Sequence, residues 1–381
     1  MADLRAKLKI EVAWSSGGYT PGATAFTDES QKTWAVTVQR GRDDELFDMQ
    51  PSRANLLVDN VGGRFNVQST AIAVRPGRSV KISGAPGDDT ATGYSAIWRG
   101  FTETINPSWR KETPTAQIEC VDALARFALI ANTRSGTDVG SPPVKIIADA
   151  LNLAGYPGGT SLISTVGPGR NLTTDSRRVT LGQNTTWTNV NLLSQINVAM
   201  QNESLGAMAF VANDGRITNH NGLRRRDQTT NDFVMDLNAS DIWDYQETIS
   251  AREVANRIHV NYVGPSFATA EDTASSQVAY GIRDLDVDTL FTAGGATLST
   301  ALLASRKDPA LRPTIILRND SSVLLRYILR AELGDQVKMT IASASGSPHK
   351  HYYIEGMHLS FHESGGVVEG RYQLTERALT I

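Results

Sequence analysis

Two segments that lie far apart in the chain share a pattern, Leu57-Val58-Asp59-Asn60 and Ile316-Leu317-Arg318-Asn319. Each has two apolar residues, then a polar residue and an asparagine, as expected where a strand ends in a turn. Further motifs follow the first segment: Val80-Lys81-Ile82, Trp98-Arg99-Gly100 and Asp122-Ala123-Leu124. Motifs in the same order follow the second segment: Val337-Lys338-Met339, Ile354-Glu355-Gly356 and Arg377-Ala378-Leu379.

The spacing of these motifs is nearly the same in the two regions. From the asparagines to Val80 and Val337 it is 20 and 18 residues, and from there to Gly100 and Gly356 it is 20 and 19. Any two β-meanders with strands of similar length would share part of this agreement. Agreement of successive intervals in one order nevertheless favours duplication of a single β domain. We expect Gly100 and Gly356 to be structural turn glycines that tolerate no bulky side chain.

Short alternating segments and turn residues dominate both ends of the chain. Residues 8–14 and 34–39 alternate between apolar and polar, as half-buried strands do, and 257–263 repeats the pattern. Strands are also expected at 312–317 and near 336–341, 351–361 and 367–374, with one amphipathic helix at about 297–305. Regularly spaced short strands favour a small barrel or sandwich.

The middle of the chain has a different character. Residues 144–155 and 188–201 have apolar positions at helical spacing, and residues 206–218 predict a hairpin with an Asp-Gly turn. The sequence therefore predicts a mainly β fold with an α+β insert. We expect a first β-barrel-like domain at 1–135, a mixed α/β insert at 136–245, and a second, related β-barrel-like domain at 246–381.

The composition excludes several classes of protein. The chain has 381 residues with a hydrophobic share of 40% and a net charge of −3, which argues against a dedicated DNA binder. Its one cysteine, Cys120, lies in an alternating segment and is expected to be a small apolar filler. The charged N-terminus lacks the apolar core of a signal peptide, and no apolar run is long enough for a membrane span. We expect assembly in a cytoplasm and no direct membrane segment.

The search for catalytic, cofactor-binding and metal-binding residues identifies none. No nucleophile elbow, phosphate loop or dinucleotide fingerprint is present. His349 and His351 lie in a Ser/Gly/Pro-rich loop without a neighbouring carboxylate, and Arg224–Arg226 is expected to be a solvated loop. The carboxylates Asp284, Asp286 and Asp288 lack the glycine and the glutamate of a calcium loop. They are more consistent with a solvated or lumen-facing edge, and we expect no enzymatic activity and no cofactor.

An ordered set of motifs resembles phage tail proteins. The motifs of the first region are Arg40-Gly41-Arg42, residues 56–60, Gly63-Arg64-Phe65, residues 78–82 and Trp98-Arg99-Gly100. In this order they resemble the opening domain of phage minor tail proteins. Residues 333–338 and 353–358 are similar to the closing β domain of the same proteins, whereas 136–245 matches only in style.

This resemblance implies the tail-tip, or baseplate, hub class, whose members are trimers with two similar barrels alternating around an axis. Such a hub adapts the six-fold tail tube to a three-fold tip, and genomic DNA passes through its bore. The expected partners are further copies of the chain, the distal tail ring, the tape measure, and a tip fibre or spike. The expected location is the tail tip of the virion. The chain ends directly after the second β region, so no fibre or enzymatic extension is expected.

Three alternatives remain at this point. A receptor- or carbohydrate-binding tail-tip protein would usually show aromatic platforms, but the aromatic share is only 7%. A hexameric distal-tail adaptor would not need an internally duplicated barrel. A cell-wall-degrading enzyme lacks support in the motifs. For the hub we expect an acidic or neutral bore, with Asp284, Asp286 and Asp288 as possible lumen-lining residues and Arg224–Arg226 facing elsewhere.

Overall fold

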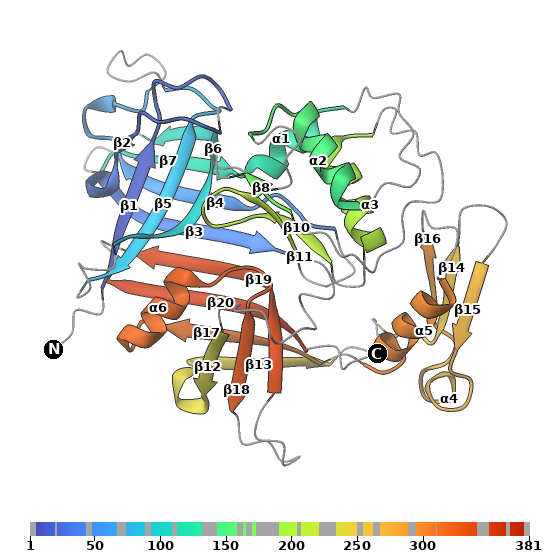
Figure 1. Cartoon of the computed structure of the whole chain (residues 1–381). Helices are drawn as coiled ribbons and strands as arrows, with labels where there is room; N and C mark the ends of the chain where they lie inside the picture. Colours follow the sequence, from blue (N-terminus) through green and yellow to red (C-terminus); the bar gives the residue numbers. More distant parts are fainter. Residues whose placement is uncertain are drawn as a thin grey trace.

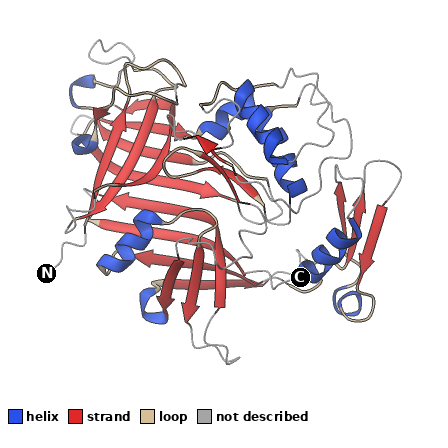
Figure 2. Cartoon of the chain, in the orientation of Figure 1, coloured by secondary structure: helices blue, strands red, loops and turns tan. Residues whose placement is uncertain are grey.

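The fold was analysed in a computed structural model. It describes residues 5–19, 21–42, 48–66, 74–87, 93–108, 113–131, 143–157, 163–164, 170–172, 190–203, 207–220, 234–249, 254–261, 267–288, 295–309, 311–340, 350–362 and 366–376. The protein is mainly β, as predicted, with one large sheet and helices on its flanks (Figures 1 and 2).

The first third of the chain supplies one end of the large sheet, here called the first half of the sheet, and the last part of the chain supplies the second half. The strands of the first half are β1 (Ala6–Val12), β2 (Thr27–Asp28), β3 (Thr33–Gly41), β4 (Arg53–Asp59), β5 (Ser79–Pro86), β6 (Ser95–Ser108) and β7 (Thr115–Val121). They pair in the order β3-β4-β7-β6-β5-β1-β2, and helix α1 (Ala123–Leu129) follows β7. Alternate residues of all the longer strands enter one apolar cluster, with Ile10, Leu56 and Ile82 among them.

The last part of the chain supplies the other end of the sheet. Its strands are β12 (Val234–Asn238), β13 (Asp244–Ile249), β17 (Leu311–Arg318), β18 (Gln336–Thr340), β19 (Lys350–His362) and β20 (Val367–Glu376), with helix α6 (Ser322–Arg330) between β17 and β18. Their pairing order, β13-β17-β20-β19-β18-β12, matches β3-β4-β7-β6-β5-β1 strand for strand and in chain order. One difference is that β1 is antiparallel to β5, whereas β12 is parallel to β18.

The pairing registers agree as well as the strand order does. Asp59 pairs with Thr115 as Arg318 pairs with Glu369, so Asn60 and Asn319 occupy equivalent positions. Ser79 pairs with Phe101 as Gln336 pairs with Tyr353, which makes Val80 and Val337 equivalent.

A β-bulge also recurs at the same place in both halves. The register of β6 against β7 shifts at Glu103, and that of β19 against β20 shifts at Glu355. Gly100 lies three residues before the bulge residue Glu103, whereas Gly356 directly follows the bulge residue Glu355. The two glycines therefore lie on equivalent strands but four positions apart.

The two halves are joined edge to edge into a thirteen-stranded sheet. Strand β3 pairs antiparallel with β19, from Gly41 opposite Gly356 to Ala35 opposite His362 (blue beside red in Figure 1). At Gly41 the backbone φ is +96°, and a Cβ there would overlap the carbonyl of Glu355, so the close approach of the strands requires glycine. Buried side chains from both halves belong to the same apolar cluster.

The insert has a second apolar core. The insert contains helices α2 (Pro143–Leu153) and α3 (Leu192–Glu203) and the strands β8 (Ile163–Ser164), β9 (Arg170–Asn171), β10 (Met208–Val211) and β11 (Ile217–His220). Its two helices share this core with α1 and with residues of β10 and β11. The predicted helix over 144–155 and the predicted hairpin are confirmed, with Gly215 at a φ of +88° in the Asp-Gly turn. The described part of the second predicted helix begins at Leu192 rather than Thr188.

A small unit with its own core lies between β13 and β17. It comprises β14 (Arg257–Asn261), β15 (Phe267–Glu271), α4 (Ser276–Tyr280), β16 (Asp284–Asp288) and α5 (Gly295–Arg306). Its strand order is β15-β14-β16, and Leu302 of α5 packs on Ile258 and Val260. The predicted boundaries at 135/136 and 245/246 stay predictions. The structure places β12 before the second boundary and this unit after it. None of the described helices is long and apolar enough to cross a membrane.

Both glycines named from the sequence occupy crowded places, which yields a test. A Cβ on Gly100 would overlap the Val121 carbonyl and the Trp98 ring, and one on Gly356 would overlap the Gln373 side chain. We expect Gly100→Val to lower the free energy of unfolding by on the order of 1–3 kcal/mol, measured by chemical denaturation. Gly356→Val should lower it by less, because the overlapped atom is the end of the flexible Gln373 side chain. Gly22→Val is the control, because nothing lies within 4 Å of its Cβ position. An unchanged midpoint for Gly100→Val would contradict the crowding.

Candidate assembly junction

The end of β3 carries two arginines that are buried where the halves meet. Val36, Val38 and Arg40 alternate on the inward face of the strand, so the period of two sends the Arg40 side chain into the interior. Beyond Gly41, the backbone N–H of Arg42 donates to the Glu355 carbonyl at 3.0 Å. Arg40 and Arg42 are only 4% and 7% exposed, so their charges depend on partners within the protein.

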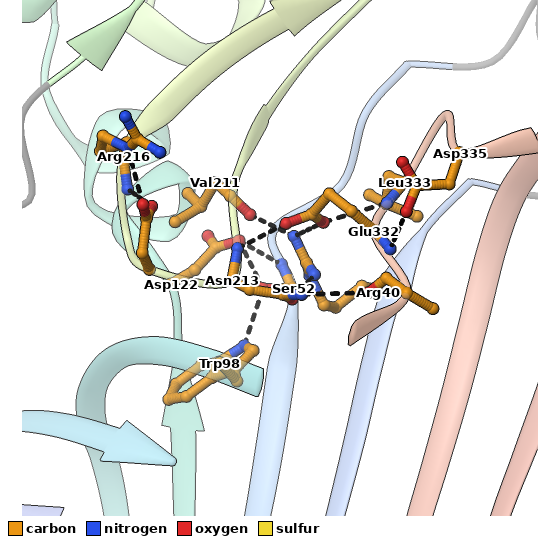
Figure 3. A network of polar contacts seen from close by, with 12 residues as sticks. Arg40, Ser52, Trp98, Asp122, Val211, Asn213, Arg216, Glu332, Leu333 and Asp335 are labelled. Carbon is orange, nitrogen blue, oxygen red and sulfur yellow. Dashed lines mark hydrogen bonds and ion pairs between the residues drawn. The ribbon is translucent and has the colours of Figure 1, made fainter. Parts of the chain in front are cut away.

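Arg40 links three parts of the chain (Figure 3). Its guanidinium forms an ion pair with Glu332 at 2.6 Å and donates to the Asn213 side chain and the Val211 carbonyl. Asn213 donates its backbone N–H to Glu332 at 2.6 Å and its side-chain amide to the Ala331 carbonyl at 3.0 Å. Arg40 belongs to the first half, Asn213 to the hairpin of the insert, and Glu332 to the loop after α6. One guanidinium therefore fixes the relative position of all three.

Arg42 makes a second, deeper ion pair. Its Nε lies 3.1 Å from Oε2 of Glu355, with side-chain exposures of 4% and 1%, and its Nη1 donates to the Ala207 carbonyl at 3.3 Å. Glu355 is the bulge residue of β19. A bulge redirects one side chain out of the strand alternation, which explains how a carboxylate reaches this interior position.

Helix α6 adds apolar contact between the halves. Ser321 caps its first turn by accepting from the Leu324 N–H at 3.1 Å, and Leu324, Leu325, Ile328 and Leu329 form its buried face. A Cβ on Gly84 of β5 would lie 2.7 Å from Leu329, so the helix of the second half packs closely on a strand of the first.

A buried carboxylate lies beside the arginines. Asp122 caps α1 by accepting from the Leu124 N–H at 2.9 Å, and it also accepts from the backbone N–H and hydroxyl of Ser52 at 2.8 and 2.5 Å. The Ser52 hydroxyl accepts in turn from the Trp98 indole at 2.9 Å. Burial raises the pKa of Asp122 to about 6, although the hydrogen bonds from Ser52 and Leu124 and the charge of Arg40 act against this shift.

Two cavities adjoin the end of β3, one toward β4 and the other toward β19 and β20. A cavity of about 480 Å³ is lined by Gln39, Arg40, Gly41, Arg42, Asp48, Gln50, Pro51 and Arg53. A smaller one of about 80 Å³ is lined by Gln39, Arg40, Gly41, Arg42, Gly356, Met357, His358, Arg371 and Gln373. Burial and the charge of Arg371 lower the pKa of His358. Within the described ranges, no three His, Cys, Asp or Glu side chains come together as a metal site.

Of the described residues named from the sequence as site candidates, only Gly356 lies at this junction, opposite Gly41. Asp284, Asp286 and Asp288 lie along an exposed face of β16 in the small unit. Arg257 donates to Asp284 at 2.8 Å and holds the pKa of that carboxyl below its usual range, and Asn261 donates to Asp288 at 2.8 Å. Cys120 is buried as predicted, and burial raises the pKa of its thiol. Arg224–Arg226 lies outside the described residues.

The sequence alone missed the partners of the two arginines. Arg40-Gly41-Arg42 contributed to the family resemblance, but no role was assigned to it, and neither Glu332 nor Asn213 was singled out. The only local signal was a charged residue at an inward position of an alternating strand, which requires a buried partner somewhere in the chain.

The comparisons with known proteins agree with this architecture. No protein-family model matches the chain, and no curated protein matches it in sequence. A tail protein from Neisseria meningitidis MC58 superposes with a TM-score of 0.65 at 11% identity, covering 98% of this chain and 97% of that one. The 43 kDa tail protein of prophage MuSo2 from Shewanella oneidensis gives 0.60 at 11% identity, with 97% of each chain covered.

The chain has the fold of phage tail proteins. A type VI secretion component of E. coli, described as structurally similar to the T4 tail proteins gp27 and gp5, matches with a TM-score of 0.52 at 9% identity. That match covers 91% of this chain and 73% of the other. The fold is therefore shared by tail proteins and by part of a secretion machine.

Removing one partner of the Arg40–Glu332 pair tests how strongly the junction holds. We expect Arg40→Met to lower the free energy of unfolding by about 2–4 kcal/mol, because the largely buried Glu332 carboxylate loses its positive partner and two acceptors, Asn213 and the Val211 carbonyl, lose the guanidinium donor. Arg53→Met, on the exposed face of the next strand, is the matched control and should change stability by no more than about 0.5 kcal/mol. Equal effects in urea titrations of the two variants would contradict a special role for Arg40.

The buried Asp122 predicts a pH dependence of stability. Its pKa is about 6 in the folded chain and 3.8 ordinarily, so the folded state retains a proton that the unfolded state loses. The contribution of Asp122 to the free energy of unfolding should therefore fall as the pH rises from about 4 to about 6, and stay constant above that. Comparing denaturation of the wild type with Asp122→Asn across this range isolates the effect. Parallel pH profiles would show that Asp122 titrates normally.

Proposed function

We propose that this chain is a structural subunit of a phage tail tip, in which three copies form a ring that joins the tail tube to the tip complex. The ring surrounds the channel through which DNA leaves. The observation that carries this proposal is the repeated arrangement of strands, with the same order, register and bulge, in a chain with a tail-protein fold.

A duplicated β unit has a direct geometric use in such a ring. Three chains with two similar units each present six similar units around the axis, so one face can meet a six-fold tube while the whole remains three-fold. In this proposal, domains 1–135 and 246–381 are the two units and 136–245 is the insert, except that strand β12, which lies before residue 246, pairs with β18 and completes the second unit. The small β14–β16 unit is an addition to the second unit.

The buried ion pairs suit a protein that must hold a fixed angle between its units. Arg40 and Arg42 each bind residues from another part of the chain, through Glu332 and Glu355. If the units rotated against each other, these charges would lose their partners inside the protein, which is costly. A fixed angle is what allows a ring to close after a set number of subunits.

The bore of the proposed ring should not bind the DNA backbone. Each lysine or arginine that neutralises a phosphate strengthens binding and would slow passage. The net charge of −3 is compatible with an acidic or neutral bore, and Asp284, Asp286 and Asp288 are the proposed lining residues. Asp286 is the middle carboxylate of this exposed row. The proposed partners are the distal tail ring, the tape measure and a tip fibre or spike, and the proposed location is the virion tail tip.

Deleting the gene from the phage tests this role directly. We expect filled heads and unassembled tails in electron micrographs of lysates, because the tube would lack the ring on which its tip is built. A copy supplied in trans should restore complete particles. Complete particles that merely fail to adsorb would contradict the hub and favour a receptor-binding protein.

A further inference from the structure

The junction inside the chain has an unfilled counterpart. Strand β3 pairs with the part of β19 that runs from Gly356 to His362. The matched registers make β13 the counterpart of β3. They also make residues 104–108 of β6 the counterpart of residues 356–360 of β19. In the described part of the chain, β13 pairs only with β17, and β6 beyond Thr102 pairs only with β7. Within the described residues, both edges are therefore open.

The two open edges expose side chains and backbone groups that a further strand could cover. Residues 246–249 at the end of β13 are all exposed, and Ile249 is 68% exposed although it is the counterpart of the inward-facing Arg40. Exposed strand edges are normally protected against pairing. Pro107 on β6 removes one donor from this edge, which leaves its carbonyl and the N–H and C=O of Ile105 for a ladder, because residues 104, 106 and 108 face β7.

We propose that β13 of one copy pairs antiparallel with residues 104–108 of β6 in the next copy, an inference that rests on the proposed ring. The register follows from the junction inside the chain: Thr248 lies opposite Asn106 as Gln39 lies opposite His358, and Ile249 lies opposite Ile105 as Arg40 lies opposite Met357. Ile249 is then covered by Ile105 of the neighbour.

This pairing determines how the copies assemble. The two edges belong to different strands, so the contact is head-to-tail and can be repeated by every copy. If it reproduces the angle of the β3–β19 junction, the units alternate around one axis with the same junction inside and between chains. The sheet then continues from copy to copy, and the ring closes without an open edge of this kind.

A designed disulfide tests the register. Directly opposed residues of antiparallel strands have Cα atoms about 4.5–5.5 Å apart, within disulfide range. Thr248→Cys combined with Asn106→Cys in one chain should, on oxidation, give covalently closed trimers on a non-reducing gel. The native Cys120 is 1% exposed and does not compete.

Two double variants are the controls. Gln39→Cys with His358→Cys occupies the equivalent pair inside the chain and should give a monomer with an internal disulfide. Thr248→Cys with Gln117→Cys should not cross-link, because Gln117 lies opposite Asn106 on β7, one strand further from the edge.

The native mass of the wild type, measured in parallel, separates this inference from the proposed function. The pairing is supported if the Thr248/Asn106 variant gives cross-linked trimers and neither control variant does. A wild-type trimer whose Thr248/Asn106 variant does not cross-link overturns the pairing but leaves the ring. A wild-type monomer without cross-linking overturns both.

Discussion

The architecture depends on two charges that cannot be left alone in the interior. Arg40 and Arg42 end the strand that joins the two halves, and each is neutralised by a carboxylate from the other half, Glu332 or Glu355. A buried ion pair adds little net stability compared with apolar packing, but it is strongly unfavourable to separate. Such a pair therefore specifies one arrangement. The edge pairing of β3 with β19 and the packing of α6 supply the binding energy, and the arginines select the angle and connect the insert to it.

The two halves share a framework and differ in what is added to it. The strand order, the register and the bulges at Glu103 and Glu355 are common to both. Of these two bulge residues, only Glu355 has a described ion pair with the other half, which it makes with Arg42. The second half also has α6 between β17 and β18, and the small β14–β16 unit between β13 and β17. In the described residues, the corresponding connections of the first half, β4 to β5 and β3 to β4, contain no α-helix. These segments lie in connections, where they do not disturb the ladder of the sheet.

Local patterns in the sequence predicted the strands and the repeat but not the contacts between halves. Alternation and turn residues identified most strands, and matched intervals placed Asn60 with Asn319 and Val80 with Val337. Helix α6 was missed, although Ser321 is a good N-cap and Leu324, Leu325, Ile328 and Leu329 form an apolar face. The Arg40 partners Asn213 and Glu332 lie 173 and 292 residues away, a pairing that no local pattern encodes. The alignment of Gly100 with Gly356 depended on intervals alone, and loops of unequal length displaced it by four positions.

We propose that this chain forms the wall of a closed ring at the tail tip. The most direct measurement is a cryo-electron microscopy reconstruction of isolated phage tails, at a resolution that separates strands. We expect three copies around the tail axis, with six similar β units alternating about an open channel whose surface is acidic or neutral. Density for the chain at the periphery of the tip, away from the axis, would contradict the claim. A channel lined mainly by lysine and arginine would contradict it equally.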